Sequence, residues 1–554
     1  MKLKGAQILV EALKKEGVEY IFGYPGGSVL PIFDALYDSN IKFILTRHEQ
    51  GAAHAADGYA RASGKVGVCI ATSGPGATNL ITGIATANMD SVPMILFTGQ
   101  VKRDLIGNDA FQEADVTGIT RSITKHNYLA KDTQDLARLI KQAFYISSSG
   151  RPGPVVIDLP VDVTIEEAEF NYPQKADISS YKPTCFGHPG QINKAAKLIK
   201  ESKKPIIYAG GGVLIADAVQ ELRELVEKNS IPITTTLLGL GCFPETHPLS
   251  LKMLGMHGTI YANYAIMNSD LIIAIGARFD DRVTGNVKEF APRAKIIHID
   301  IDPTAIGKNI PVDVPIVGDA KNILKELNGL VQKPDIEPWL EQVKEWKKKN
   351  PLVYGQGNKL KPQYIMQEIY NLTKGDAIIV TEVGQNQMWA AQFYNYTKPR
   401  TFISSGGLGT MGYGLPAAIG AQIGCPDKTV FDIAGDGSIQ MNIQELITAV
   451  LNKLPIKIAI LNNSYLGMVR QWQELFYKKR YSHTHLVNPD FIQLAEAYGA
   501  VGFRIKKKDD VIPTLKKALD IEKPVVMDFL IEKEENVFPM VPAGAAIDRM
   551  IEMA

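Results

Sequence analysis

Asp436 and Asn463 are the residues whose types and positions indicate chemistry most clearly. Asp436 follows the apolar run VFDIA, within Gly-Asp-Gly-Ser, and Asn463 follows the apolar run IKIAIL. A helical pattern at 439–451 separates the two runs, and a strand–helix–strand crossover usually makes its strands neighbours. Mg²⁺ prefers oxygen ligands such as these, completed by water and phosphates. Gly437 has no side chain, so the backbone there can approach a ligand closely, and the helix that starts at Ser438 points its backbone amides towards an anion. We therefore expect a diphosphate–Mg²⁺ site.

The pattern of an apolar strand followed by a turn and a helix recurs along the whole chain. A short apolar run precedes a glycine-rich or polar turn, and a helical pattern follows. Continuous apolar strands that alternate with helices predict parallel sheets covered on both faces, with ligands at the carboxyl ends of the strands. The predicted fold class is therefore α/β with doubly wound parallel sheets. The expected strands are 66–71, 206–209, 271–275, 296–302, 378–380, 430–434, 456–461 and 525–531.

Two polar stretches that contain prolines, 166–190 and 332–362, look like linkers. They divide the 554 residues into three blocks of similar size, in line with about 150 residues per domain. The predicted domains are 1–165, 190–330 and 360–540. The remaining tail, 541–554, is apolar and poorly patterned, so it is interpreted either as a lid or as a frayed terminus.

Composition excludes several classes of protein. The 60 basic and 59 acidic residues give a net charge of +1, which argues against binding nucleic acid through its phosphates. The four cysteines are scattered and form neither a disulfide framework nor a zinc pattern. No apolar run reaches the roughly 20 residues of a membrane span, and the first 20 residues read as an amphipathic helix rather than a signal peptide. We expect a cytoplasmic protein with no membrane or nucleic-acid partner.

The segment from GDG to NN resembles the thiamine-diphosphate signature. That resemblance implies that Mg²⁺ is held by Asp436, Asn463 and the backbone carbonyl of Tyr465. It also implies a glutamate that activates the aminopyrimidine ring by proton transfer, and Glu49 in IKFILTRHEQGAAHAADGYAR stands in the matching place. The simpler interpretations are a turn with a capping aspartate for GDG, and a glutamate favoured by the helix dipole for Glu49.

Motifs along essentially the whole chain, among them GYPGGSVLP, ATSGPGATNL, DAFQEADV and GLGTMGYGLPAAIGA, resemble the catalytic subunit of acetohydroxyacid synthase (acetolactate synthase). The resemblance implies three doubly wound parallel-sheet domains of the thiamine-diphosphate-enzyme type. It places Gly27 by the reactive end of the cofactor, makes Gln112 face the active site, and has Met411 support the folded thiamine. By position alone, Met411 would be a core methionine. The further cofactor contacts that it implies are Val383, Gly384, Gln385, Gly409, Gly437 and Ser438.

The middle block resembles a dinucleotide-binding domain, although GxGxxG is missing from the expected place. A vestigial nucleotide fold with nothing bound is the alternative. The motif RFDDR resembles the FAD-containing biosynthetic acetohydroxyacid synthases, and the flavin would be structural because the reaction has no net redox change. The residues implied around FAD are Arg151, Gly211, Gly212, Met256, His257, Gly276, Arg278, Asp280, Asp300 and Asp319.

Substrate recognition is also implied by resemblance. Arg282 would hold the carboxylate of the acceptor 2-keto acid in a fork of two hydrogen bonds; a surface ion pair with Asp280 or Asp281 is the alternative. Trp472 would line the substrate channel together with Met468 and Val469 and favour 2-ketobutyrate as acceptor, unless it lies in the core.

The expected reaction decarboxylates pyruvate and transfers the two-carbon unit to a second pyruvate or to 2-ketobutyrate, an early step towards branched-chain amino acids. The resemblance implies a homodimer, in which the first and third blocks meet across the subunit boundary, and a separate regulatory subunit is common. The alternatives are a glyoxylate carboligase, which lacks the glutamate, an FAD-free acetolactate synthase, which lacks RFDDR, or a non-catalytic flavin- or nucleotide-binding protein. Val161 and Lys102 depart from the family pattern, so sensitivity to channel-blocking inhibitors is in doubt.

Overall fold

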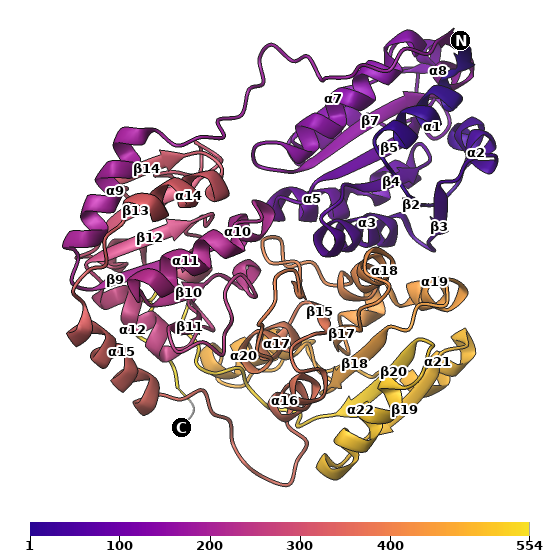
Figure 1. Cartoon of the computed structure of the whole chain (residues 1–554). Coiled ribbons are helices and arrows are strands. Elements are labelled where there is room, and N and C mark those ends of the chain that lie inside the picture. Colours follow the sequence, from indigo (N-terminus) through magenta and orange to yellow (C-terminus); the bar gives the residue numbers. More distant parts are fainter. Residues whose placement is uncertain (553–554) are drawn as a thin grey trace.

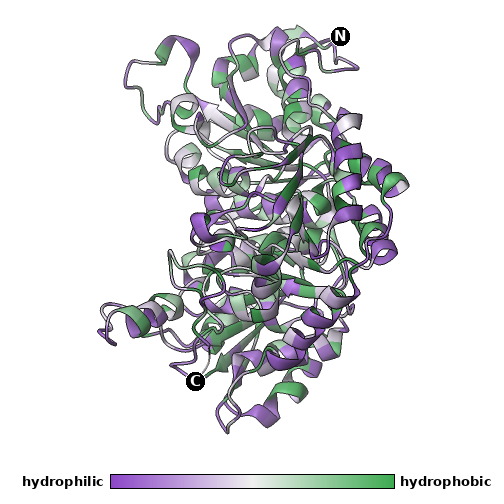
Figure 2. Ribbon diagram, turned by 90° about the vertical axis from the view of Figure 1, so that its left-hand side faces the viewer, coloured by the Kyte–Doolittle hydropathy of each residue, from purple (hydrophilic) through white to green (hydrophobic). Residues whose placement is uncertain are grey.

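The computed structural model describes residues 1–552 and contains three parallel six-stranded sheets, each with helices on both faces (Figure 1). Figure 2 shows apolar residues concentrated in the strands and hydrophilic residues along the outer faces of the helices. This confirms the predicted α/β class with three doubly wound sheets. Among the described residues, no helix has the length and apolar character needed to cross a bilayer.

The N-terminal sheet has the strand order β3-β2-β4-β5-β7-β6, and a separate pair, β1 and β8, is antiparallel. Its strands alternate with helices along the chain. The strands are β1 (Lys2–Lys4), β2 (Tyr20–Gly23), β3 (Lys42–Leu45), β4 (Gly67–Ala71), β5 (Met94–Gln100), β6 (His126–Leu129), β7 (Pro154–Pro160) and β8 (Glu167–Glu169). The helices are α1 (Gly5–Lys15), α2 (Leu30–Tyr37), α3 (Glu49–Ser63), α4 (Pro75–Asn79), α5 (Ile81–Asp90), α6 (Val116–Thr120), α7 (Leu136–Ser148) and α8 (Val161–Ile165).

The central sheet has the order β11-β10-β9-β12-β13-β14. Its strands are β9 (Pro205–Ala209), β10 (Ile233–Thr235), β11 (Ser250–Met253), β12 (Leu271–Ile275), β13 (Lys295–Asp300) and β14 (Val314–Val317). The helices are α9 (Pro189–Glu201), α10 (Gly211–Ile215), α11 (Val219–Asn229), α12 (Ile260–Asn268), α13 (Asp281–Thr284), α14 (Ala320–Leu330) and α15 (Glu337–Lys349).

The C-terminal sheet has the order β16-β15-β17-β18-β20-β19. Its strands are β15 (Ile378–Thr381), β16 (Phe402–Ile403), β17 (Val430–Gly435), β18 (Lys457–Asn462), β19 (Val501–Ile505) and β20 (Val525–Leu530). The helices are α16 (Pro362–Thr373), α17 (Gln385–Phe393), α18 (Gly414–Gly424), α19 (Leu446–Leu451), α20 (Gly467–Phe476), α21 (Phe491–Tyr498) and α22 (Val511–Leu519). As predicted, β17 and β18 are parallel neighbours.

In each sheet the direction of winding reverses between two neighbouring inner strands. This topological switch point lies between β2 and β4 in the first sheet, between β9 and β12 in the second, and between β15 and β17 in the third. The loops that leave two such strands diverge to opposite faces of the sheet, which opens a crevice at their carboxyl ends. Three equivalent crevices are thus available to hold ligands.

Three segments differ from the sequence prediction. The expected helix 439–451 is two short 3₁₀ turns followed by α19, because Asn442 adopts a non-helical φ of −136° and donates from its side chain to Gly412 O. The stretch 332–362, expected to be a linker, contains α15, whose Trp339 is buried in the central core. The described part of the tail packs on the central domain, where Val541 and Ile547 are buried; residues 553–554 lie outside the described residues.

The first and third domains meet through α3 and α18, which lie against each other (Figure 1). Most of α3 is buried, and the residues at the crossing are small. A methyl group at Gly420 would lie 1.8 Å from Ala55 O, and one at Gly58 would lie 2.0 Å from Ala417 O. The two helix backbones therefore touch, and glycine is required at this crossing because any side chain would force them apart.

Gly420→Ala is expected to destabilise the protein by about 1–3 kcal/mol or more, since the contact is with backbone atoms that cannot rotate away. The midpoint of thermal unfolding measures this effect. Gly329→Ala is the matched control: it is exposed on α14, no described atom lies within 4 Å of the added methyl group, and the change should be neutral or stabilise by roughly 0.5–1 kcal/mol. Equal midpoints for the two variants would contradict the packing argument.

Candidate active site

The crevice of the C-terminal sheet holds the acidic and amide groups expected to bind a metal. Asp436 follows β17 and Asn463 follows β18, and both are buried. The backbone amide of Asn463 donates weakly to Asp436 Oδ1 at 3.4 Å, while its side chain donates to Gln385 Oε1 at 3.2 Å. The two strand ends therefore lie together, as the crossover predicts.

The buried carboxylate of Asp436 and the oxygen atoms near it suit a hard cation. Its carboxylate accepts a hydrogen bond from Asn488 Nδ2 at 2.6 Å, and among the described residues no Lys, Arg or His lies within ion-pair distance of it. Burial raises the pKa of Asp436 to about 6, although the bond from Asn488 opposes this. A buried carboxylate without a counter-ion is costly, and a divalent cation would compensate it. No cluster of three His, Cys, Asp or Glu side chains is found among residues 1–552, so such a cation would depend on amide and carbonyl oxygens.

The N-terminal crevice brings together three residues singled out from the sequence. They surround the turn 72–76 that follows β4. Glu49 is the first residue of α3, half-buried, and accepts a hydrogen bond from Asn79 Nδ2 at 2.9 Å. A methyl group at Gly76 would lie 3.3 Å from Glu49 Oε1, and one at Gly74 would lie 2.8 Å from Gln112 O. Gly27 is adjacent, because the next residue, Ser28, bonds to Thr72; among the described residues nothing lies within 4 Å of a methyl group built on Gly27.

The position of Glu49 agrees with a helix-dipole contact, and its role in proton transfer stays a prediction. It occupies the first turn of a helix, where the dipole favours a negative charge, and it also faces the crevice. Within one chain, the start of α3 is tied to the third domain through Glu445, which accepts bonds of 2.9 Å from the backbone amides of Arg47 and His48. That carboxylate fixes where α3 begins.

The remaining residues expected around thiamine lie in loops at the C-terminal switch point. Val383, Gly384 and Gln385 lead from β15 into α17. Gly409 and Met411 lie in the turn 404–413 between β16 and α18, which we call the Met411 turn. The Met411 turn is held from the first domain by Asp90, which accepts bonds from the backbone amides of Gly406 and Gly407. Gly437 lies beside Leu466 and Leu486, and the Ser438 hydroxyl points inward to Glu382.

The central crevice contains the glycines expected near FAD. The backbones of Gly212, in α10, and Gly276, after β12, touch: a methyl group at Gly212 would lie 2.6 Å from Gly276 Cα. Gly211 begins α10. Burial raises the pKa of Asp300, at the end of β13, to about 6. The contact between Gly212 and Gly276 is the close packing of a helix on a strand end that is typical of dinucleotide-binding folds.

The other residues expected around FAD lie near the carboxyl ends of the central-sheet strands and at the boundary with the other domains. Arg151, from the first domain, forms an ion pair with Asp302 at 3.3 Å, near Asp300. Arg278 lies by Gly407 of the Met411 turn. Asp280 and Asp319 cap α13 and α14.

The C-terminal tail and RFDDR form one cluster with Met256 and His257. The backbone amide of Met256 donates to Arg282 O at 2.7 Å, and that of Val541 donates to Met256 O at 2.8 Å. Burial lowers the pKa of His257 to about 4, so its imidazole is neutral at pH 7. The tail therefore packs beside the helix that carries Arg282.

Of the two interpretations for Arg282, the single chain contains the ion pair: its side chain is 60% exposed and lies 3.1 Å from Asp281 Oδ2. An ion pair this exposed contributes little, about 0–1 kcal/mol, so the guanidinium can leave Asp281 at small cost.

The helix α20 presents the three residues expected to line a channel. Val469 is 51% exposed, Met468 packs partly on the core, and Trp472 is half-buried with its ring 5.6 Å from that of Phe476. Trp472 is therefore outside the fully buried core. The buried face of α20 is instead polar: Arg470 donates to Glu535 O and Asn536 Oδ1.

Sequence reasoning missed several residues that the fold brings to the site. Asn488 contacts Asp436 from a loop far along the chain, and no local pattern indicates it. Asn79, the partner of Glu49, lies in the quoted motif ATSGPGATNL, which could have suggested it. Glu382, buried and bonded to Ser438, is an acidic residue two positions after the predicted strand 378–380, and this position near a strand end could have indicated it.

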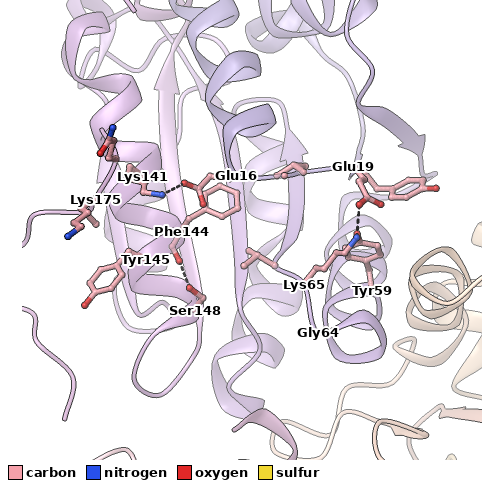
Figure 3. A pocket seen from close by; sticks show the side chains of 16 residues that line it. Glu16, Glu19, Tyr59, Gly64, Lys65, Lys141, Phe144, Tyr145, Ser148 and Lys175 are labelled. Carbon is pink, nitrogen blue, oxygen red and sulfur yellow. Dashed lines mark hydrogen bonds and ion pairs between the residues drawn. The ribbon is translucent and has the colours of Figure 1, made fainter. Parts of the chain in front are cut away.

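A cavity of about 740 Å³ lies away from all of these residues (Figure 3). It is at the opposite end of the N-terminal sheet, beside the start of β2, and is bordered by Lys65, Lys141 and Lys175. Lys65 pairs with Glu19 and Lys141 with Glu16.

Comparison with known proteins identifies the three domains. Residues 3–119, 192–327 and 382–529 match, respectively, the N-terminal TPP binding domain, the central domain and the C-terminal TPP binding domain of thiamine pyrophosphate enzymes. The chain is 51% identical to the acetolactate synthase large subunit of Corynebacterium glutamicum, over 98% of this chain and 89% of the relative. It is 52% identical to the probable acetolactate synthase large subunit of Methanocaldococcus jannaschii (99% and 95%). For the large subunit of acetolactate synthase isozyme 3 of Escherichia coli the identity is 47% (99% and 98%).

Proposed function

This chain belongs to the thiamine pyrophosphate enzymes and, among them, to the acetolactate synthase large subunits, and on that premise we propose which of its residues perform the reaction. As an acetolactate synthase it joins two 2-keto acids with loss of CO₂. Bound thiamine diphosphate supplies the nucleophilic carbon for this chemistry. The protein must bind that cofactor, move its proton, and orient two anionic substrates.

The diphosphate group of the cofactor would bind in the C-terminal crevice. Asp436, Asn463 and the carbonyl of Tyr465 would hold Mg²⁺, and Asn488 orients the Asp436 carboxylate through its 2.6 Å hydrogen bond. The supporting observation is that this buried carboxylate lies at a topological switch point, among amide groups, with no basic partner in residues 1–552. Mg²⁺ there would neutralise both the carboxylate and the diphosphate.

Glu49 is the proton-transfer residue. Its carboxyl group would hydrogen-bond a ring nitrogen of the cofactor and so promote loss of the proton at the reacting carbon. Asn79 holds the Glu49 side chain in place, while Gly27 leaves room beside it and Gln112 lies across the same turn. Since Glu49 and Asp436 belong to different domains, we propose a homodimer in which each pocket combines one chain's Glu49 with the other chain's Asp436.

FAD would occupy the central crevice as a structural cofactor. Gly212 and Gly276 let α10 pack closely against the end of β12, as in dinucleotide-binding folds, and Asp300 stands at the adjacent strand end, where a ribose hydroxyl would bind. Arg278, next to the Met411 turn, would connect the flavin site to the thiamine site. Because the relatives are named large subunits, a separate small subunit is also part of this proposal.

Arg282 would orient the acceptor 2-keto acid. Its guanidinium would leave the weak, exposed pair with Asp281 and hold the acceptor carboxylate in two parallel hydrogen bonds. The C-terminal tail, packed beside α13, would then close over the bound acceptor.

Product analysis with pyruvate and 2-ketobutyrate together tests the proposal. Purified protein with thiamine diphosphate and Mg²⁺ should form both 2-acetolactate and 2-aceto-2-hydroxybutyrate, and denatured protein should release FAD. Product formation by protein free of flavin would reject the FAD assignment while leaving the thiamine site intact.

Trp472→Leu should reduce the preference for 2-ketobutyrate over pyruvate as acceptor. A single methylene in an apolar pocket is worth about 1–3 kcal/mol, and the half-buried indole, together with the exposed Val469, is the surface that the extra methylene would contact. The ratio of the two products in competition measures this preference. Phe186→Leu, which changes an exposed aromatic side chain outside the C-terminal domain, is the control and should leave the ratio near that of the parent. An unchanged ratio in the Trp472 variant would rule out this role.

A further inference from the structure

A pair of buried acids lies beneath the proposed thiamine site. Glu382 directly follows β15, and Asp432 lies in the neighbouring strand β17, opposite Val380. Both side chains are fully buried. A methyl group at Gly414 would lie 2.4 Å from Asp432 Oδ1 and 2.8 Å from Glu382 Cγ, so both acids border the same small space.

The two acids have very different partners. Glu382 accepts hydrogen bonds from Gly412 N at 2.8 Å, Leu415 N at 3.2 Å and the Ser438 hydroxyl at 2.5 Å. Neither carboxyl oxygen of Asp432 has a hydrogen-bond partner within residues 1–552. No basic side chain lies within ion-pair distance of either acid in that part of the chain.

Elementary electrostatics decides which acid carries the charge. Two adjacent carboxylates in a dry interior cannot both ionise at acceptable cost, and donors favour the charged form. Glu382 has three donors and Asp432 has none. In agreement, burial and the neighbouring Glu382 raise the pKa of Asp432 well above its usual range, while for Glu382 the donors oppose the rise that burial causes.

The charged member joins two loops of the proposed cofactor site. Gly412 follows Met411 in the Met411 turn. Ser438 is the last residue of the loop 435–438, Gly-Asp-Gly-Ser, which contains Asp436 and which we call the diphosphate loop. One carboxylate therefore binds the Met411 turn, the diphosphate loop and the first turn of α18 together.

We propose that Glu382 is a positioning residue, whose carboxylate fixes the Met411 turn relative to the diphosphate loop, and that Asp432 beside it is a neutral acid. This inference rests on the proposed function for the site and extends it, since it names a residue that acts on the cofactor through the two loops.

Glu382→Gln and Asp432→Asn test this asymmetry, because both changes are isosteric and remove one possible charge. Glu382→Gln should raise the dissociation constant of thiamine diphosphate at least about tenfold and lower kcat, since hydrogen bonds to a charged acceptor are the strong ones. Asp432→Asn replaces a neutral acid by a neutral amide and should stay within about threefold of the parent. Binding is measured by tryptophan fluorescence with Mg²⁺ present. Equal effects, or a larger effect for Asp432→Asn, would overturn the proposal.

Two further measurements keep the test decisive. In infrared difference spectra without cofactor, the band of a protonated carboxyl group should be lost in Asp432→Asn and kept in Glu382→Gln; its presence in both variants would overturn the neutral state of Asp432. If Glu382→Gln fails to fold, Glu382→Asp keeps the charge but withdraws the carboxylate from its three donors and should weaken cofactor binding, and unchanged binding would contradict the link. Parent protein that binds no thiamine diphosphate but shows the band would reject the proposed function and leave the acid pair intact.

Discussion

Glu49→Gln should lower kcat for acetolactate formation by about 10²–10⁴-fold, the usual contribution of a positioned proton-transfer group. An amide cannot share a proton with the pyrimidine ring as a carboxylic acid does. The substitution is nearly isosteric, and the oxygen of the new amide still accepts the hydrogen bond from Asn79. The start of α3 is also held independently by the bonds from Arg47 and His48 to Glu445. The loss should therefore appear in catalysis and not in folding.

Three measurements isolate this effect. Steady-state kcat gives its size, exchange of the reactive cofactor proton with deuterium gives its cause, and thermal unfolding shows that the fold is retained. Glu19→Gln is the matched control: it removes a carboxylate from the same domain, in an exposed pair with Lys65, and should leave kcat unchanged. Proton exchange at the parent rate in Glu49→Gln would show that another group activates the cofactor.

Asp436→Ala should weaken the binding of both Mg²⁺ and thiamine diphosphate strongly. Losses of about 10–100-fold in metal affinity are typical even for residues that only support a ligand, and a direct charged ligand should cost at least as much. Asp436→Asn is the sharper variant, because it keeps an acceptor for Asn488 and removes the negative charge alone. Since burial of that charge is unfavourable without a cation, apo protein carrying Asp436→Asn should unfold at the same temperature as the parent or higher.

Titration of the cofactor at several Mg²⁺ concentrations measures this loss. Asp376→Asn, which removes an exposed aspartate paired with Lys398, is the control and should leave the Mg²⁺ requirement unchanged. An Asp436→Asn variant with the parent's Mg²⁺ requirement would place the metal elsewhere.

The sequence by itself was sufficient for the class of sheet and for the eight strands that it predicts, including the two that precede Asp436 and Asn463. Apolar runs separated by helices specify parallel strands, because strands buried on both faces need apolar side chains throughout. Asp436 and Asn463 could be located for that reason, since a single right-handed crossover joins their strands. The two strands are joined by a short segment, so the local sequence pattern is enough to predict that they are neighbours.

Only the tertiary structure decided the contacts between segments that lie far apart in the chain. The bond from Asn488 to Asp436, the contact of Glu445 with the start of α3, and the burial of Arg470 on α20 leave no periodic trace in the sequence. The same holds for Glu382 and Asp432: hydrophobic patterning indicates where strands lie, whereas the charge of a buried acid depends on which donors the fold places around it. That is decided by packing between elements, which the order of the residues specifies only through the complete fold.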